Sequence, residues 1–195
     1  MSNDPRADEV LEYWFGARGG DEWGKFRQQW FRGGKQADDE IRERFSELHA
    51  QARRGELDDW KQSAEGSLAL VIVLDQFSRN LHRGTAEAFA ADAKGLALAK
   101  QAVAAGFDQA VLPTQRWFFY LPFEHAEDIA EQRRSLELMS ALPDDEDKKI
   151  GVDYAKQHLD IIERFGRFPH RNEMLGRDST PEETKWLAEG GTRFG

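Results

Sequence analysis

Apolar residues recur along this chain at the three-to-four-residue spacing of an α-helix, and a strand-like alternation of apolar and polar residues is nowhere sustained. Ile41, Phe45 and Leu48 lie on one such stripe, which Gly55 ends. Residues 68–74 are apolar on every side, so we predict a helix buried in the middle of the fold. A buried parallel strand is the alternative for this run, but the chain offers no second strand-like run to pair with it.

Helix signals mark most of the remaining boundaries. Asp4 and Pro5 have the residue types of an N-cap and a first helical position, Gly16 is a stop, and Ser67 can cap the apolar run. Pro122 falls inside a long helical pattern, where its missing backbone donor predicts a kink or a restart. We predict an all-α domain of seven or eight helices, paired as antiparallel hairpins and spanning residues 1–195, with further helices over residues 86–105, 114–141 and 148–165 and from 181 onward.

Composition excludes several classes of function. The net charge is −9, which argues against binding nucleic acid or an anionic membrane, because both require a continuous basic face. The absence of cysteine excludes disulfides and thiolate chemistry and fits a reducing compartment. The longest apolar run has seven residues, against the ~20 of a membrane-spanning helix, and the polar N-terminus lacks a signal-peptide core. We therefore expect a soluble, cytoplasmic protein.

Two loops at helix ends share a polar motif. Residues 75–85 and 164–172 each place an Arg-Asn pair after an aromatic residue, Arg79-Asn80 in the first and Arg171-Asn172 in the second. Both loops carry more Arg and His than a turn requires. Arginine suits bidentate binding of carboxylate or phosphate, but it also caps helix C-termini. These loops supply most of our candidate ligand-binding residues, namely Asp75, Arg79, Asn80, Arg83, Arg167, His170, Arg171 and Asn172.

Asp75 precedes Arg79 by four positions, so the two can form a bridge along a continuing helix. Two interpretations stay open: a buried structural ion pair, or a carboxylate that holds the Arg79 guanidinium flat for a bidentate anionic ligand.

Two histidines are predicted to face the interior. His125 and Gln132 share a stripe with apolar neighbours, and His158 lies in the middle of a second stripe. Each imidazole is either a hydrogen-bonded core residue or part of a site. Taken as a site, His125, His158 and the neighbouring Glu124 are the catalytic candidates, and Gln132 joins the ligand-binding ones.

Templates for other chemistry are missing. The chain has no His-Glu-x-x-His or Glu-x-x-His motif and none of the glycine-rich phosphate or nucleophile motifs, so we expect neither a metal nor a cofactor. Ser78 has no nearby base in the sequence, which argues against a serine hydrolase.

Four blocks of the chain carry a family resemblance. They are residues 10–16 (VLEYWFG), 74–99 (containing LDQFSRN), 120–138 (containing LPFEHAED) and 158–183 (containing RFGRFPHRN). They resemble a widespread, mostly bacterial family catalogued as a domain of unknown function. The resemblance implies an all-α fold similar to tetratricopeptide helical hairpins and implies no activity. Family members more often have proline where Ser78 stands, so here the helix can continue toward Asn80.

Two classes of function remain after these steps. In one, a closed pocket lined by Arg, His and Asp binds, or acts on, a small anionic metabolite, and Asp75, Arg79, His125, His158 and Arg171 converge on it. In the other, the protein is a tetratricopeptide-like scaffold that binds a peptide, a partner protein or a second copy of itself. Inward-facing His and Arg exceed what a peptide groove needs and favour the pocket, while the sequence leaves open whether the protein is an enzyme.

Overall fold

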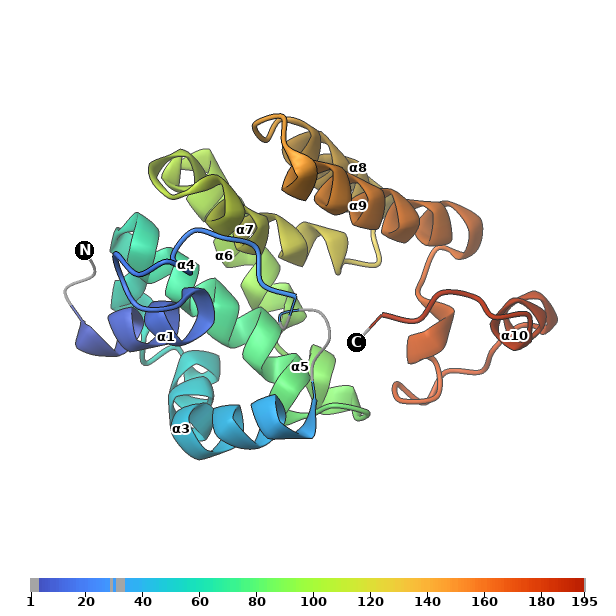
Figure 1. Cartoon of the computed structure of the whole chain (residues 1–195). Coiled ribbons are helices and arrows are strands. Elements are labelled where there is room, and N and C mark those ends of the chain that lie inside the picture. Colours follow the sequence, from blue (N-terminus) through green and yellow to red (C-terminus); the bar gives the residue numbers. More distant parts are fainter. Residues whose placement is uncertain (1–3, 29, 31–33, 195) are drawn as a thin grey trace.

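The computed structural model describes residues 4–28, 30 and 34–194 and contains helices without strands within these ranges. Short turns join the helices, and the chain ends close to the middle of the molecule (Figure 1). The helices are α1 (Pro5–Phe15), α3 (Lys35–Arg54), α4 (Ala64–Ile72), α5 (Ser78–Leu81), α6 (Asp92–Ala104), α7 (Pro113–Glu124), α8 (Ile129–Ser140), α9 (Glu146–Phe165) and α10 (Pro181–Ala188), with short helical turns η1 (Asp58–Gln62), η2 (Val73–Phe77), η3 (Ala86–Phe89), η4 (Phe107–Ala110) and η5 (Pro169–Arg171). The predicted all-α class is confirmed.

Helix ends follow the sequence signals at several positions. Asp4 caps α1 by accepting a hydrogen bond from the backbone of Arg6, and Gly16 ends the helix at a φ of 91°. Gly55 ends α3 in the left-handed conformation that glycine adopts without strain.

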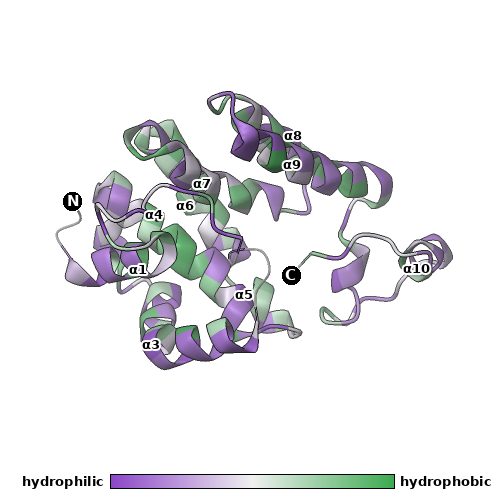
Figure 2. Ribbon diagram, in the orientation of Figure 1, coloured by the Kyte–Doolittle hydropathy of each residue, from purple (hydrophilic) through white to green (hydrophobic). Residues whose placement is uncertain are grey.

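The apolar run is a helix, as predicted, and it forms the centre of the fold. It begins earlier than expected, because Ser63 caps it at Ala64, while Ser67 is buried one turn inside α4. The helix packs against α1, α6 and α7, and Figure 2 shows hydrophobic residues gathered along it. It then continues through the π-helical turn η2 into α5 and reaches Leu81, beyond Asn80.

Two predicted helices are each divided in the structure. The pattern over residues 86–105 splits into η3 and α6, and the pattern over residues 114–141 splits into α7 and α8. Pro122 lies inside α7, and the break falls three residues later, over residues 125–128. Asp128 caps α8 there, and Gln132 donates to the carbonyls of Glu124 and Ala126. The chain therefore reverses where side chains satisfy the exposed backbone groups, rather than at the proline.

The C-terminal part forms a small apolar cluster of its own beside the main core. Ile161, Ile162 and Phe168 are its buried members, and Trp186 and Phe194 pack against them. The chain after α10 turns back toward α5 (Figure 1). This return places the last described residues beside α9.

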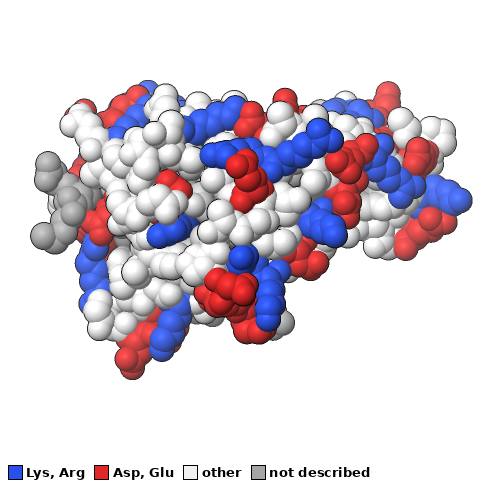
Figure 3. Space-filling view, turned by 90° about the horizontal axis from the view of Figure 1, so that it is seen from above, with Lys and Arg blue, Asp and Glu red and all other residues white. Residues whose placement is uncertain are grey.

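The surface agrees with an acidic, mixed-charge protein. Basic and acidic side chains alternate over the face shown in Figure 3, without a continuous basic area on that face. No helix in the described part of the chain combines the length and apolarity needed to cross a bilayer.

Candidate functional site

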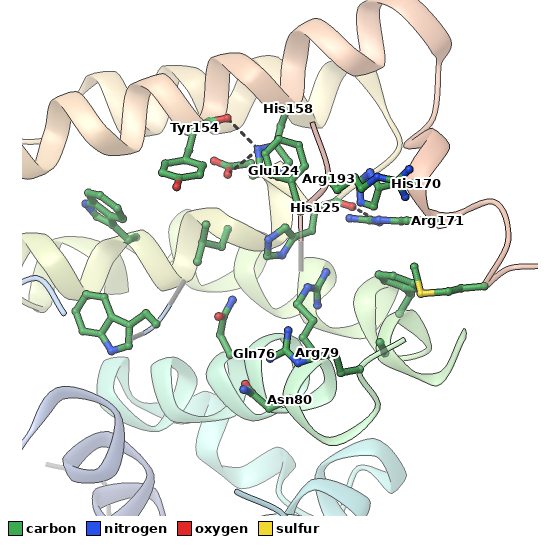
Figure 4. A pocket seen from close by; sticks show the side chains of 18 of the residues that line it. Gln76, Arg79, Asn80, Glu124, His125, Tyr154, His158, His170, Arg171 and Arg193 are labelled. Carbon is green, nitrogen blue, oxygen red and sulfur yellow. Dashed lines mark hydrogen bonds and ion pairs between the residues drawn. The ribbon is translucent and has the colours of Figure 1, made fainter. Parts of the chain in front are cut away.

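A cavity of about 460 Å³ lies between the central helix, α7, α9 and the returning C-terminal segment. Figure 4 shows its labelled side chains converging from these separate elements. Eight of the predicted site residues line it: Arg79, Asn80, Arg83, Glu124, His125, His158, His170 and Arg171. Asp75 stands directly behind this wall and is hydrogen-bonded to His125.

The π-helical turn η2 positions the residues on the central helix. A π turn leaves backbone carbonyls without their usual α-helical partners. Side chains satisfy two of them here: Ser78 Oγ donates to the Leu74 carbonyl at 2.6 Å, and Arg79 Nη1 donates to the Asp75 carbonyl at 2.9 Å. The turn therefore places the Asp75 carboxylate behind the cavity wall, next to the Arg79 guanidinium that lines it.

Asp75 orients the imidazole of His125. Its carboxylate accepts from His125 Nδ1 at 2.8 Å and from the Gln76 amide at 2.6 Å, and it lies 3.0 Å from Arg79 Nη1. Burial alone would raise the pKa of Asp75, but the positive charge of Arg79 and the bond to His125 hold it well below its usual range. Burial, followed by the charge of Arg79, lowers the pKa of His125. The ring is therefore neutral near pH 7, with its proton on Nδ1 and Nε2 left as the acceptor.

His158 and Glu124 form a second, uncharged pair. His158 Nδ1 lies 2.9 Å from the Tyr154 carbonyl and 3.1 Å from Glu124 Oε1, so it carries the proton. Burial raises the pKa of Glu124 to about 8, and burial with the neighbouring His125 lowers that of His158 well below its usual value. His158 Nε2 is buried and has no hydrogen-bond partner among the described residues, while the ring of Phe194 stacks on the imidazole at 3.5 Å.

Arg79 is fully occupied by protein carboxylates. Asp92 accepts from both of its terminal nitrogens, at 3.0 and 3.1 Å, in addition to the contact with Asp75. The bidentate acceptor of this guanidinium is therefore Asp92. Sequence analysis missed it because Asp92 lies in an alanine-rich helix with no other polar motif.

Arg171 is placed differently. Its guanidinium lies between the rings of Phe168 and Phe89, 4.3 and 4.7 Å from their centroids, and only Nη1 makes a hydrogen bond, to the His125 carbonyl at 3.0 Å. Asp92 is its nearest carboxylate, 3.8 Å away. Burial, together with the charge of Arg79, lowers the pKa of Arg171 to about 10. The Nε–Nη2 edge makes no hydrogen bond to a described residue, and Nε is buried.

Besides Asp75, three predicted ligand-binding residues lie outside the cavity. Gln132 is fully buried on the turn between α7 and α8, as described above. Arg167 donates two hydrogen bonds to Glu183, at 2.7 and 2.8 Å. Asn172 donates to Ser179 and Glu183 and accepts from Arg177. All three hold parts of the fold together: Gln132 fixes the turn between α7 and α8, and Arg167 and Asn172 fix α10 and the segment before it. Spacing along the chain does not reveal these partners.

Several other residues of the cavity wall have no distinguishing pattern in the sequence. These include Trp30, Gln76, Phe89, Trp117, Leu121, Met139, Gly151, Tyr154, Met174, Arg193 and Phe194. Their helical spacing is that of ordinary core positions, and Arg193 and Phe194 arrive only through the return of the C-terminal segment.

Ser78 does meet a histidine in the structure. His49 Nε2 lies 2.7 Å from Ser78 Oγ, although the two are far apart in sequence. Ser78 Oγ already donates to the Leu74 carbonyl and is fully buried, so it accepts its second bond from the histidine. This pair supports the π turn and does not resemble an activated nucleophile.

The cavity thus combines neutral imidazoles, a neutral carboxyl and a partly paired guanidinium. His125 and His158 can accept a proton at Nε2, and Glu124 can donate one. In the described part of the chain, no three His, Asp or Glu side chains are arranged to hold a metal ion.

Comparison with known proteins identifies relatives without an assigned activity. A family model described as "Bacterial protein of unknown function (DUF924)" matches residues 10–191. A solved structure, a protein of unknown function, ATU0120, from Agrobacterium tumefaciens, is 43% identical, has a TM-score of 0.84, and is matched over 95% of this chain and 98% of its own. No curated protein matches the chain. The chain therefore belongs to the DUF924 family of bacterial proteins of unknown function.

Proposed function

We propose that the protein binds a small anionic metabolite in this cavity, with the free edge of Arg171 as the anion-binding group. One observation carries the proposal: a buried guanidinium, packed against two aromatic rings, lines the cavity, and its Nε–Nη2 edge makes no hydrogen bond to a described residue. That edge has the two parallel donors that bind a carboxylate or phosphate in bidentate fashion.

Further unpaired atoms support the same proposal. His158 Nε2 and both ring nitrogens of His170 are buried without a partner among the described residues, and both side chains line the cavity beside Arg171. Buried polar atoms are normally hydrogen-bonded, and leaving one unpaired costs about 1–3 kcal/mol. A bound anion with oxygen atoms would supply acceptors to Arg171 and to a protonated nitrogen of His170.

The cavity also has the groups for acid–base chemistry on such a ligand. Asp75 holds His125 in one tautomer, and we assign His125 as the proton acceptor, with His158 and neutral Glu124 as the second pair. Arg79, which Asp75 and Asp92 already neutralise, acts as a positioning residue for Asp75 rather than as a direct anion ligand.

The peptide-binding scaffold has no comparable observation behind it. The large apolar side chains exposed in the described part of the chain are Leu112, Ile129, Ile150 and Tyr154, each only 37–40% exposed.

A thermal-shift titration tests the proposal. Sulfate or phosphate should raise the melting temperature in a saturable manner, relative to chloride at equal ionic strength, because a ligand that binds only the folded protein stabilises it by mass action. Arg171→Met should abolish the saturable rise. Arg164→Met is the matched control, because Arg164 is half-exposed and pairs with exposed Glu182, and it should keep the rise. An equal rise in the wild type and in Arg171→Met, or none beyond that of chloride, would contradict the proposal.

A further inference from the structure

We propose that the anion is amphipathic: a monocarboxylate with an unbranched alkyl or arylalkyl tail, bound with its carboxylate at Arg171 and its tail among the apolar residues at the opposite end. This inference rests on the proposed function, which assigns the anion site, and it adds the chemical class of the ligand.

The cavity has two chemically different ends. In Figure 4, His170 and Arg171 lie at one end, Tyr154 lies at the other, and His125 and His158 lie between them. Arg171 and His170 carry the unpaired polar atoms. Toward the other end, α9 carries Gly151 about one turn before Tyr154, and Trp117 and Met139 lie against Gly151. These residues and Leu121 line the cavity and carry no charge.

Helices α7 and α9 both line the cavity, and their rise gives its approximate length. On α9, Gly151, Tyr154 and His158 succeed one another along one face, and seven residues of helix rise about 10 Å. On α7, Trp117 and Leu121 lead to His125, and eight residues rise about 12 Å. Both helices pass from apolar to polar residues in the same direction. The apolar end, where we place the tail of the ligand, therefore lies about 10 Å along these helices from the histidines.

Gly151 allows α9 to pack closely against its neighbours at the apolar end. A Cβ built on Gly151 would lie 3.0 Å from the indole of Trp117 and 3.3 Å from the sulfur of Met139. Its φ is not in the left-handed region, so no backbone conformation requires glycine here. The missing side chain instead lets Trp117 and Met139 lie close against α9, so any side chain at this position would displace these two residues, which line the apolar end.

A carboxylate fits the polar end better than a bulkier dianion. It is planar, as is the guanidinium, so its two oxygens match the two donors of one guanidinium edge, and the rings of Phe168 and Phe89 pack against Arg171. Near pH 7 the acid of the wall, Glu124, is neutral and does not repel it, because burial raises its pKa to about 8.

The test is isothermal titration with acetate, butyrate, hexanoate and octanoate, each below its micellar concentration. Burying one methylene contributes about 0.8 kcal/mol, so Kd should fall about fourfold for each added methylene until the apolar end is filled. Gly151→Ala should weaken octanoate binding at least fivefold and leave acetate binding unchanged. Arg171→Met should weaken every member of the series, because all share the carboxylate.

Two controls separate specific from surface binding. Leu112→Ser removes an exposed apolar side chain outside the cavity and should change none of the affinities. Circular dichroism verifies that Gly151→Ala is folded, and Leu121→Thr provides a second variant at the same end, with the same expected loss for octanoate alone.

The possible outcomes distinguish failure of the amphipathic ligand from failure of the anion site. If acetate and phosphate bind at Arg171 but Kd does not change with chain length, the amphipathic ligand is wrong and the anion site stands. If octanoate binds equally to the wild type, Gly151→Ala and Arg171→Met, it binds elsewhere and the inference is overturned. If no anion binds, both this inference and the proposed function are wrong.

Discussion

The two Arg-Asn loops use their asparagines alike and their arginines differently. In the first loop, Asn80 donates to Asp38 of α3, and Arg83 pairs with the same carboxylate. In the second, Asn172 donates to Glu183 of α10, and Arg167 pairs with that carboxylate. Each asparagine thus anchors its loop to a distant helix through a carboxylate that a second arginine neutralises.

The arginines differ in what compensates their charge. Arg79 has two carboxylates, Asp75 and Asp92, within 3.0 Å. Arg171 has two aromatic faces, one carbonyl and a carboxylate 3.8 Å away. The same dipeptide therefore places one arginine in a completed structural network and the other in a site that an anion would complete. Four predictions test this difference.

The largest expected effect is on the completed network. Arg79→Met leaves Asp75 and Asp92 buried or half-buried without their main counter-charge, and breaking such a pair typically costs about 3–5 kcal/mol of unfolding free energy. Urea denaturation measures this loss. A loss below about 1 kcal/mol would show that Arg79 is no more structural than Arg171, and the comparison would fail.

The anchoring asparagines should have the next largest effect. Asn80→Ala and Asn172→Ala each remove a hydrogen bond to a carboxylate, which contributes about 1.5–3 kcal/mol, and Asn172 should cost more because it also bonds Ser179 and Arg177. Urea denaturation of both variants provides the values. If only one of them is destabilised, the parallel between the two loops is wrong.

These contacts also explain which features of the fold and of the candidate site can be predicted from the sequence. Helical stripes and caps predicted the class, the central helix and the convergence of residues from two loops and two inward-facing helices on one cavity. Asp92 and Glu183 could not be predicted, because each partner comes from a helix placed only by tertiary packing. For the same reason, the sequence predicts that Arg167 and Asn172 bind the ligand, whereas both donate hydrogen bonds to Glu183 of α10.

The third prediction concerns Glu124, because its ionisation would add a negative charge to the cavity that Arg171 lines. Its pKa is raised by burial to about 8 from 4.5, so the folded state binds the extra proton and stability falls as pH rises through this window. The histidines contribute a slope of opposite sign: burial lowers the pKa values of His49 and His170 to about 4 and those of His82, His125 and His158 below 6.5. Stability therefore falls as pH falls through 6.5, and this effect extends about one pH unit above that value.

The contribution of Glu124 between pH 6.5 and 8 is therefore measured as the difference between the wild type and Glu124→Gln, which keeps all the histidines. One proton over this interval corresponds to a loss of about 2 kcal/mol. Glu124→Gln, which keeps the shape without the charge, should gain stability relative to the wild type as pH rises from 6.5 to 8 in urea denaturation. An equal pH dependence of the two proteins would mean that Glu124 is already ionised when folded, so that the cavity lined by Arg171 already holds a negative charge.

The smallest expected effect belongs to Arg171 and distinguishes the two arginines most sharply. In chloride buffer, Arg171→Met loses one hydrogen bond to the His125 carbonyl. It also removes a buried cation, whose pKa is lowered to about 10 by burial and by the charge of Arg79. Replacing a poorly compensated buried charge by an apolar side chain is often neutral or stabilising, so the unfolding free energy should stay within about 1 kcal/mol of the wild type. A loss as large as that of Arg79→Met would instead make Arg171 part of the structural network. Stability retained in chloride, together with loss of the stabilisation by sulfate, is the combination expected of a residue kept for a ligand.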